Sequence, residues 1–260
     1  MISLGCDIGA IATKTVIVKD GSIAAYDITP NKGQLAQAAQ HSVERVLSQT
    51  GISLDEITHR AGTGWGEKYI PFSRTSESMI SCLAKGAHWI EPAARTVVNI
   101  GGLGATIVSI NGERGKVIEY RTNDRCASGT GFFLELSAQA LELKVEELGP
   151  VSLSAKGRAH ISAQCAVFGE SEIVTHVNDG AEPADIAAGI TYSIGASVAS
   201  MVKRLSVEKE IVVTGGVAKN KAVVKALEEK LGVETADVQL DSQIICALGA
   251  ALLAVERVKE

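Results

Sequence analysis

The feature of the sequence that most restricts the fold is an internal repeat. Residues 6–9 (Cys-Asp-Ile-Gly) match residues 98–101 (Val-Asn-Ile-Gly) at an offset of 92 positions. In both copies an apolar strand and a tight turn follow at nearly the same spacing, with the turns at residues 20–21 and 111–112. Repetition at a fixed interval indicates a repeated structural unit. The repeat therefore predicts two related α/β lobes, each with a glycine-rich hairpin, and a ligand site in the cleft between them.

Hydrophobic periodicity and glycine turns place the elements of the two lobes. We expect strands over residues 2–8, 15–19, 23–26, 96–100, 106–110, 116–120 and 211–216, the last of which runs into a glycine turn. We expect helices over residues 34–48, 130–143, 184–203, 220–231 and 243–258. The predicted domains are a first lobe over 1–94, rejoined by the C-terminal helix 243–260, and a second lobe over 95–242.

Composition restricts the possible binding partners and the cellular compartment of the protein. The net charge is −5 and no block of Lys and Arg runs along any segment, which argues against nucleic acid. No apolar run reaches the roughly 18–20 residues that span a bilayer, and residues 1–5 lack the basic start of a signal peptide. We therefore expect a cytoplasmic protein with no membrane partner. In that compartment five cysteines do not indicate a disulfide framework.

The first copy of the repeat carries residue types that bind the phosphates of a nucleotide. Asp7 stands at the end of the first strand, a glycine turn over Gly9 and Ala10 follows, and Thr13 and Lys14 come next. Backbone N–H groups and a lysine favour phosphate oxygens, and a carboxylate favours a hydrated Mg²⁺. An Asp-x-Gly turn is common, and taken alone it is more often a plain turn.

Two more glycine turns follow strands later in the chain. Gly101 and Gly102, in the second copy of the repeat, are expected to face the same phosphates from the other lobe. Gly215, Gly216 and Asn220 follow the strand that begins at residue 211, and glycines there let a nucleoside approach the backbone closely. Three such turns in this order predict a nucleotide site far more specifically than any one of them.

Two of the cysteines stand apart from the rest. Cys126 lies in a glycine-bearing loop directly before a predicted helix, and Cys165 stands before another helix that opens with Glu-Ser-Glu. Unpaired N–H groups at a helix N-terminus stabilise a thiolate. The two cysteines do not complete a four-cysteine site in one chain, but two chains related by a two-fold axis would supply four thiolates, the ligand count of a [4Fe–4S] cluster. The remaining cysteines are expected to be inert and buried: Cys6, Cys82 and Cys246.

The glycine turns resemble those of the actin/Hsp70/sugar-kinase ATPase superfamily over nearly the whole chain. Residues 5–14 resemble its first phosphate loop, 99–103 its second and 214–220 its adenosine loop. Residues 247–251 resemble the small-residue helix that crosses back between the lobes. The resemblance implies an α/β fold of two RNase H-like lobes, an interlobe nucleotide cleft, and lobe closure governed by ATP or ADP with Mg²⁺ at Asp7.

The cysteine loops resemble closely those of the activators of 2-hydroxyacyl-CoA dehydratases and of the ATPase subunits of benzoyl-CoA reductases. In that family Asn-Asp-Lys-Cys-Ala-Ala-Gly-Thr-Gly and Cys-Thr-Val-Phe-Ala-Glu-Ser-Glu carry the cluster ligands, and here they stand as residues 123–131 and 165–172. The resemblance implies that Cys126 and Cys165 of two subunits share one [4Fe–4S] cluster. It also implies ATP-driven electron transfer, a ferredoxin-like donor, a CoA-ester dehydratase or reductase as acceptor, and an anaerobic host.

The sequence departs from that family at acidic positions. The family's second phosphate loop, Asp-Ile-Gly-Gly-Gln-Asp, is Asn-Ile-Gly-Gly-Leu-Gly at residues 99–104. The family's Glu-Ile-Ser-Cys-His-Ala-Lys-Gly stands as residues 79–86 without the glutamate and the histidine. Asn99 cannot accept a proton at neutral pH. With Asp7, Lys14 and Asn99 as the catalytic residues, we expect nucleotide binding to be retained and hydrolysis to be weakened.

Several alternatives stay open at this point. The chain is as compatible with a homodimeric activator as with a divergent subunit that pairs with a paralogous, acid-complete ATPase. A nucleotide-binding scaffold without a cluster is a function consistent with the loss of the acidic residues. A small-molecule kinase shares the phosphate loops, but it leaves both cysteine loops unexplained.

Overall fold

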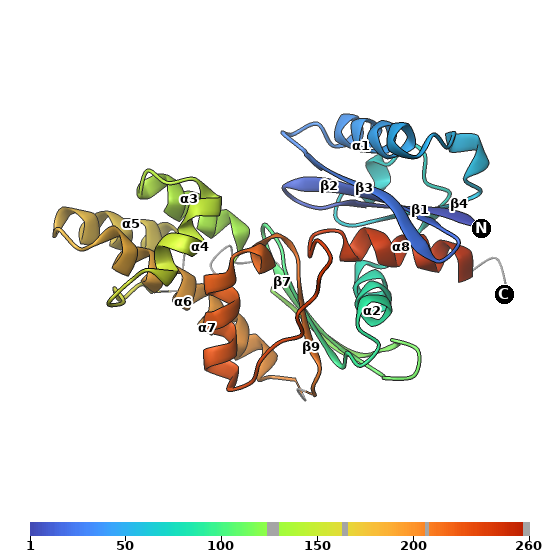
Figure 1. Cartoon of the computed structure of the whole chain (residues 1–260). Helices are drawn as coiled ribbons and strands as arrows, with labels where there is room; N and C mark the ends of the chain where they lie inside the picture. The colour runs from blue at the N-terminus through green and yellow to red at the C-terminus, as the bar shows by residue number, and fades with distance from the viewer. Residues whose placement is uncertain (124–129, 163–165, 206–207, 257–260) are drawn as a thin grey trace. The chain divides into compact units, whose positions relative to one another are not determined.

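The computed structural model describes residues 1–123, 130–162, 166–205 and 208–256 (Figure 1). Cys126 and Cys165 therefore lie outside the described residues. Contacts divide the chain into two compact units. The first contains Met1–Val97, Val108–Glu119 and Asp237–Glu260, and the second contains Val98–Ile107 and Tyr120–Ala236.

The first sheet has the strand order β3-β2-β1-β4-β5. β1 (Ile2–Ile8) pairs antiparallel with β2 (Ala12–Lys19), which pairs antiparallel with β3 (Ser22–Pro30). On its other side β1 pairs parallel with β4 (His59–Thr63), and β4 pairs with the short β5 (Thr75–Ser76). Because β1 and β4 run in the same direction, the segments that follow Ile8 and Thr63 meet at one edge of this sheet.

Helices cover both faces of the first sheet (Figure 1). α1 (Leu35–Thr50) packs through Ala39 and Val43 on the face that carries Ile17, while α8 (Ile245–Glu256) packs on the face of Val16. Neighbouring residues of β2 thus point to opposite faces, as the pleat of a strand requires. The remaining helical segments of this unit are the following: the 3₁₀ turns Leu54–Glu56 (η1) and Glu67–Tyr69 (η2), and α2 (Met79–Ile90).

The small residues of α8 have a packing reason. A Cβ on Gly5 of β1 would lie 2.0 Å from the carbonyl oxygen of Ala247, and a Cβ on Gly249 would lie 1.8 Å from that of Cys82 in α2. Backbones this close leave no room for a side chain. Gly5 in β1 and Gly249 in α8 therefore let α8 lie directly against β1 and α2.

The second sheet repeats the order of the first. Its strands are β6 (Thr96–Ile100), β7 (Ala105–Ile110), β8 (Val117–Asn123) and β9 (Ile211–Thr214), in the order β8-β7-β6-β9. In the first hairpin the Gly9 N–H donates to the carbonyl of Ala12, and in the second the Gly101 N–H donates to that of Gly104. Both bonds keep the offset of 92 residues seen in the sequence. The repeat is thus a repeat of structure.

The helices of the second unit surround α6 (Pro183–Val202). The others are α3 (Gly131–Ala140), α4 (Val145–Leu153), α5 (Ala166–Asn178), the 3₁₀ turn η3 (Gly216–Lys219) and α7 (Lys221–Leu231). Ile186, Ile190 and Ile194 of α6 are fully buried. α6 also has the length and apolar composition of a membrane-crossing helix, contrary to the expectation that no run reaches that length. Because 61% of that window is buried inside the structure, α6 has the character of a core helix.

Element ends differ from the prediction by a few residues, for local reasons. α1 runs to Thr50, past the predicted residue 48, and is capped by Gly51, which takes the left-handed φ of 68°. α3 stops at Ala140 rather than at residue 143, because Glu142 takes a φ of 56°. α8 begins at Ile245 and not at residue 243, because the Gln243 N–H donates to Asp241 Oδ1 in the preceding turn.

Candidate functional site

Asp7 and Lys14 form an ion pair across the first hairpin. They are register partners in β1 and β2, and Lys14 Nζ lies 3.0 Å from Asp7 Oδ2. The two side chains are only 13% (Lys14) and 8% (Asp7) exposed. A carboxylate and an ammonium group held at a strand end are the charges that a phosphate–Mg²⁺ complex pairs with.

The turn beside this pair is held by a residue that sequence reasoning missed. The Asn31 side chain donates from Nδ2 to the Gly9 carbonyl at 2.7 Å, and its Oδ1 accepts from Thr13 Oγ1 at 2.7 Å. Thr13 is fully buried, so its hydroxyl is committed to this support. At Gly9 a Cβ would lie 2.8 Å from Lys14 Nζ, so the glycine leaves room for the lysine. Ala10 is exposed at the tip of the turn.

A second glycine turn, also missed from sequence, packs on Asp7. Gly64 follows β4 with a φ of +90°, and a Cβ there would lie 2.3 Å from Asp7 Oδ1. The N–H of Gly66 donates to the carbonyl of Ile8 at 3.0 Å. Trp65, between these two glycines, is 68% exposed. The signal available in the sequence was the Gly-Trp-Gly run directly after a strand.

The second sheet reproduces this arrangement with an amide in place of the acid. Gly215 follows β9 with a φ of +89°, and a Cβ there would lie 2.3 Å from the Ile100 oxygen and 2.8 Å from Asn99 Oδ1. Thr214 Oγ1 donates to Asn99 Oδ1 at 3.2 Å. Asn99 is therefore the structural counterpart of Asp7, and Gly215 is the counterpart of Gly64.

The Gly101-Gly102 turn is joined to the start of α3. The N–H of Gly131 donates to the Gly101 carbonyl at 2.9 Å, and that of Phe132 donates to the Gly102 carbonyl at 2.8 Å. A Cβ on Gly131 would lie 3.3 Å from the Cα of Gly102, so a small residue at position 131 lets the start of α3 lie against the glycine turn. α3 is the helix that follows the loop of Cys126, and its first turn is thus fixed to the second glycine turn.

Asn220 and Gly216 lie at the start of α7. Asn220 caps the helix, and its Oδ1 accepts from the N–H groups of Ala222 at 3.1 Å and Val223 at 3.2 Å. Gly216 begins the 3₁₀ turn that leads to this cap. The segment 214–220 therefore connects β9 to α7 by a glycine turn and a capped helix start.

The structure describes three of the five cysteines. Cys126 and Cys165 lie outside the described residues, and within those residues no group of three or more His, Cys, Asp and Glu side chains is arranged to hold a metal. Cys6, Cys82 and Cys246 are buried free thiols, as expected. Burial raises the pKa of Cys6 to about 12, so it stays protonated. A hydrogen bond with Cys82, together with burial, raises the pKa of Cys246 well above its usual range.

Comparison with known proteins places this geometry in a family. Residues 4–254 match the BadF/BadG/BcrA/BcrD ATPase family. The chain belongs to this family. The match covers both glycine hairpins, the Gly215 turn and both cysteine loops, and it confirms the family predicted from the sequence.

Relatives in the family are named for enzymes of CoA esters. The (R)-2-hydroxyglutaryl-CoA dehydratase activating ATPase of Acidaminococcus fermentans is 36% identical over 256 residues, which are 98% of this chain and 97% of that one. A benzoyl-CoA reductase component from Thauera aromatica is 30% identical over 261 residues, covering 96% of this chain and 92% of that one.

Solved structures agree with the fold. The activator of the 2-hydroxyisocaproyl-CoA dehydratase from Clostridium difficile, solved with bound ADPNP, has a TM-score of 0.94 and 35% identity, covering 100% of this chain and 96% of that one. A ROK hexokinase from Thermus thermophilus, 15% identical, has a TM-score of 0.52 over 100% and 99% of the two chains. The second likeness concerns the fold alone. Together they confirm the predicted α/β fold of the actin/Hsp70/sugar-kinase type.

Proposed function

We propose that this protein is an ATP-dependent activator that delivers low-potential electrons to a CoA-ester dehydratase or a benzoyl-CoA reductase-type enzyme. The observation that carries the proposal is similarity along the whole chain to a relative named as a dehydratase activating ATPase and to one named as a benzoyl-CoA reductase subunit, at 36% and 30% identity. The ion pair of Asp7 and Lys14 beside a glycine turn supports the nucleotide part. The two cysteine loops of the sequence support the electron-transfer part.

For the nucleotide we assign roles by residue chemistry. Asp7 holds a hydrated Mg²⁺, Lys14 with the turn over Gly9 and Ala10 contacts phosphate oxygens, and Thr13 supports that turn through its hydrogen bond to Asn31. Gly101 and Gly102 contact phosphates through the backbone, and Gly215, Gly216 and Asn220 contact the nucleoside. Asn99 occupies the place of a second acid without being able to take a proton. In this proposal the lobes are residues 1–94 with 243–260, and residues 95–242.

For the cluster we assign Cys126 and Cys165 from each of two subunits. A [4Fe–4S] cluster supplies one-electron chemistry at low potential. The described residues add two supports: α3 starts at Gly131 and α5 at Ala166, each shortly after a cysteine, so helix N-termini favour thiolates there. α3 is also hydrogen-bonded to the Gly101-Gly102 turn, which links a phosphate loop to a cluster loop through two bonds.

The partners follow from the same proposal. The cluster requires a second subunit, which is either another copy of this chain or a paralogous ATPase that retains the acids. The electron donor is a small ferredoxin-like carrier, and the site of action is the cytoplasm. The neutral Asn99 favours a second candidate function, a nucleotide-binding scaffold with weak hydrolysis. A small-molecule kinase is the least favoured function, because it gives Cys126 and Cys165 no role.

Anaerobic purification tests the proposal. We expect a brown protein with about four irons per dimer. Cys126→Ser and Cys165→Ser are each expected to lose the iron and the colour. Cys82→Ser, which changes a buried thiol distant in sequence from both, is expected to retain the iron and the colour. A colourless, iron-free protein after anaerobic reconstitution, still binding Mg-ADP, would establish the scaffold and reject electron transfer.

A further inference from the structure

The turn after β4 and the turn after β9 are two copies of one structure. Gly64 follows the last residue of β4 and Gly215 follows the last residue of β9, and their φ values are +90° and +89°. A Cβ on Gly64 would lie 2.5 Å from the Ile8 oxygen, and a Cβ on Gly215 would lie 2.3 Å from the Ile100 oxygen. Each turn therefore packs closely against the glycine hairpin of its own sheet.

The next residue is where the two copies differ most. In the second unit it is Gly216, which has no side chain, and in the first unit it is Trp65. After Trp65, the N–H of Gly66 donates to the Ile8 carbonyl at 3.0 Å, and a Cβ on Gly66 would lie 2.3 Å from Ile8 Cγ2. The backbone of Trp65 is thus fixed by the contacts of the residues on both sides of it.

The side chain of Trp65 is exposed although its backbone is fixed. It is 68% exposed, in a chain that has only two tryptophans. Burial of a large apolar ring is favourable, and tryptophan is enriched among the residues that dominate binding. A fixed turn that holds an exposed indole therefore indicates a ring that contacts a ligand.

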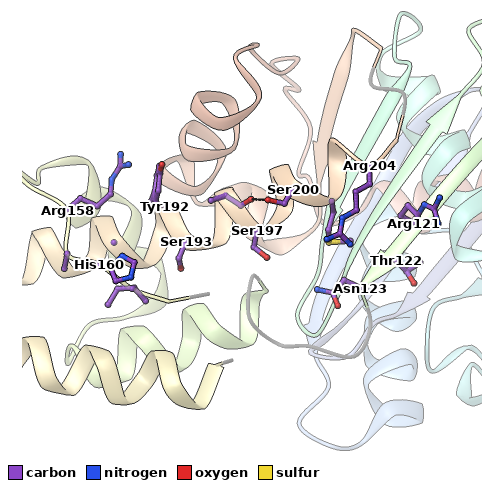
Figure 2. A pocket seen from close by; sticks show the side chains of 15 residues that line it. Arg121, Thr122, Asn123, Arg158, His160, Tyr192, Ser193, Ser197, Ser200 and Arg204 are labelled. Atoms are coloured by element: carbon purple, nitrogen blue, oxygen red, sulfur yellow. Dashed lines mark hydrogen bonds between the residues drawn. The ribbon is translucent and has the colours of Figure 1, made fainter. Parts of the chain in front are cut away.

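Another aromatic ring of the chain shows what a structural role looks like. The ring of Tyr192 in α6 lies between two cations, the guanidinium of Arg158 at 3.6 Å and Lys230 Nζ at 4.8 Å (Figure 2). Within the part of the chain that the structure describes, no cation stacks on the ring of Trp65. Contacts inside the fold thus explain the position of Tyr192 but not that of the Trp65 ring.

Trp65 stands at the edge of the first sheet that carries the charges of the candidate site. Asp7 is the register partner of Thr63 in the parallel pair of β1 and β4, and it forms the ion pair with Lys14. A Cβ on Gly64, the residue before Trp65, would lie 2.3 Å from Asp7 Oδ1. Ligands of open α/β sheets bind beyond the carboxyl ends of the strands. The Trp65 side chain is therefore within reach of a ligand bound there.

We propose that Trp65 is a nucleotide-contacting residue, whose ring covers the phosphate–Mg²⁺ group held by Asp7 and Lys14. This inference rests on the proposed nucleotide site. An indole over that group excludes water, and interactions between charges are stronger where water is excluded. The indole N–H also supplies a donor for a phosphate oxygen. The glycine at the equivalent place in the second unit agrees with the nucleoside being assigned to that turn.

Fluorescence of the full-length protein tests the contact, because each tryptophan can be observed alone. The other tryptophan is Trp89 in α2, so Trp89→Phe leaves Trp65 as the only indole and Trp65→Phe leaves Trp89. During titration with Mg-ADP we expect the emission of Trp89→Phe to shift to shorter wavelength, because the Trp65 ring leaves water. The emission of Trp65→Phe is expected not to shift.

Substitutions measure what the ring contributes to binding. Trp65→Ala is expected to weaken Mg-ADP binding about tenfold in calorimetry, and Trp65→Phe, which keeps an aromatic ring, is expected to recover most of the affinity. The KM for ATP should rise in parallel while kcat changes by less than about twofold, because the ring contributes binding and not chemistry. Trp89→Phe is the control and should bind as the wild type does. Circular dichroism checks that each variant is folded.

Two results overturn the proposal. The first is unchanged Mg-ADP affinity in a folded Trp65→Ala protein. The second is an unshifted emission of Trp89→Phe at concentrations where calorimetry shows that Mg-ADP is bound. Failure of the wild-type protein to bind Mg-ADP is a different result, which would reject the nucleotide site itself and this contact with it.

Discussion

At the residue scale, the two copies of the hairpin differ in one charged group. Asp7 and Asn99 occupy equivalent strand ends, and each is packed by a left-handed glycine, Gly64 or Gly215. Asp7 carries an ion pair with Lys14, whereas Asn99 accepts from the Thr214 hydroxyl. A carboxylate carries a negative charge and can accept a proton, whereas an amide is neutral and cannot accept a proton at neutral pH. We therefore expect weak hydrolysis with retained nucleotide binding.

An acidic side chain at position 99 is expected to raise the rate of ATP hydrolysis. Asn99→Asp should raise the rate of ATP hydrolysis at least about tenfold, short of the 10²–10⁴ that a positioned acid–base group supplies, because Leu103 and Gly104 also lack the family's polar groups. Phosphate release by the purified protein measures it. Asn111→Asp, in the outer turn of the second hairpin, is the matched control. Equal rates in the wild type and Asn99→Asp would show that this position does not limit hydrolysis.

Asn31 supplies a second prediction at this scale. Asn31→Asp keeps the acceptor for Thr13 but removes the donor to the Gly9 carbonyl. We expect Mg-ADP affinity to fall about tenfold, since the half-buried Gly9 carbonyl loses its partner and the turn loses support. Calorimetric titration measures the affinity. Gln34→Glu makes the same change of charge at an exposed position nearby and is expected to have little effect; an equal loss there would assign the effect to charge alone.

At the scale of elements, the close packing of α8 on β1 explains why a glycine stands at residue 5 of β1. Gly5→Ala would place a Cβ 2.0 Å from the Ala247 oxygen, which only a shift of α8 relieves. We expect the free energy of unfolding to fall by roughly 1–3 kcal/mol, the range for overpacking. Denaturant unfolding measures it.

Gly51→Ala is the control for that substitution. A Cβ on Gly51 meets nothing within 4 Å, but its φ of +68° costs about 1 kcal/mol. If Gly5→Ala lowered the free energy of unfolding no more than Gly51→Ala does, α8 would not lie as close to β1 as the structure places it.

Strong local patterns made part of this fold predictable. β1 and β6 were predicted from apolar strand patterns and α6 from a helical pattern, and the offset of the two hairpins predicted two related α/β lobes. β4 was missed because His59–Thr63 is polar and short, and its strand character comes from pairing with β1. α4 was missed because Pro150 lies inside it.

The residues that support the candidate site were harder to predict from the sequence than the site residues themselves. Asp7, Gly9 and Lys14 are close in sequence and were identified together. Asn31 reaches Gly9 from the far end of β3, and Gly64 reaches Asp7 from the end of β4. The Gly-Trp-Gly run signals a turn, but neither contact can be read from local sequence, because both depend on which strands lie side by side.

At the scale of the whole molecule, each sheet presents one glycine hairpin and one left-handed glycine at a strand end. The Gly101-Gly102 turn is tied to α3, the helix that follows the loop of Cys126. In the proposed function a nucleotide at that turn therefore acts on the surroundings of the cluster, and the surroundings of a cluster set its potential.

The midpoint potential of the cluster, titrated anaerobically with and without Mg-ADPNP, tests this coupling most directly. We predict that the nucleotide makes the potential more negative by about 60 mV or more, a tenfold effect for one electron. Asp7→Asn, which removes the proposed Mg²⁺ ligand, should abolish the shift while leaving the iron content unchanged. The same potential with and without nucleotide, in protein shown to bind both cluster and Mg-ADPNP, would contradict ATP-dependent electron transfer.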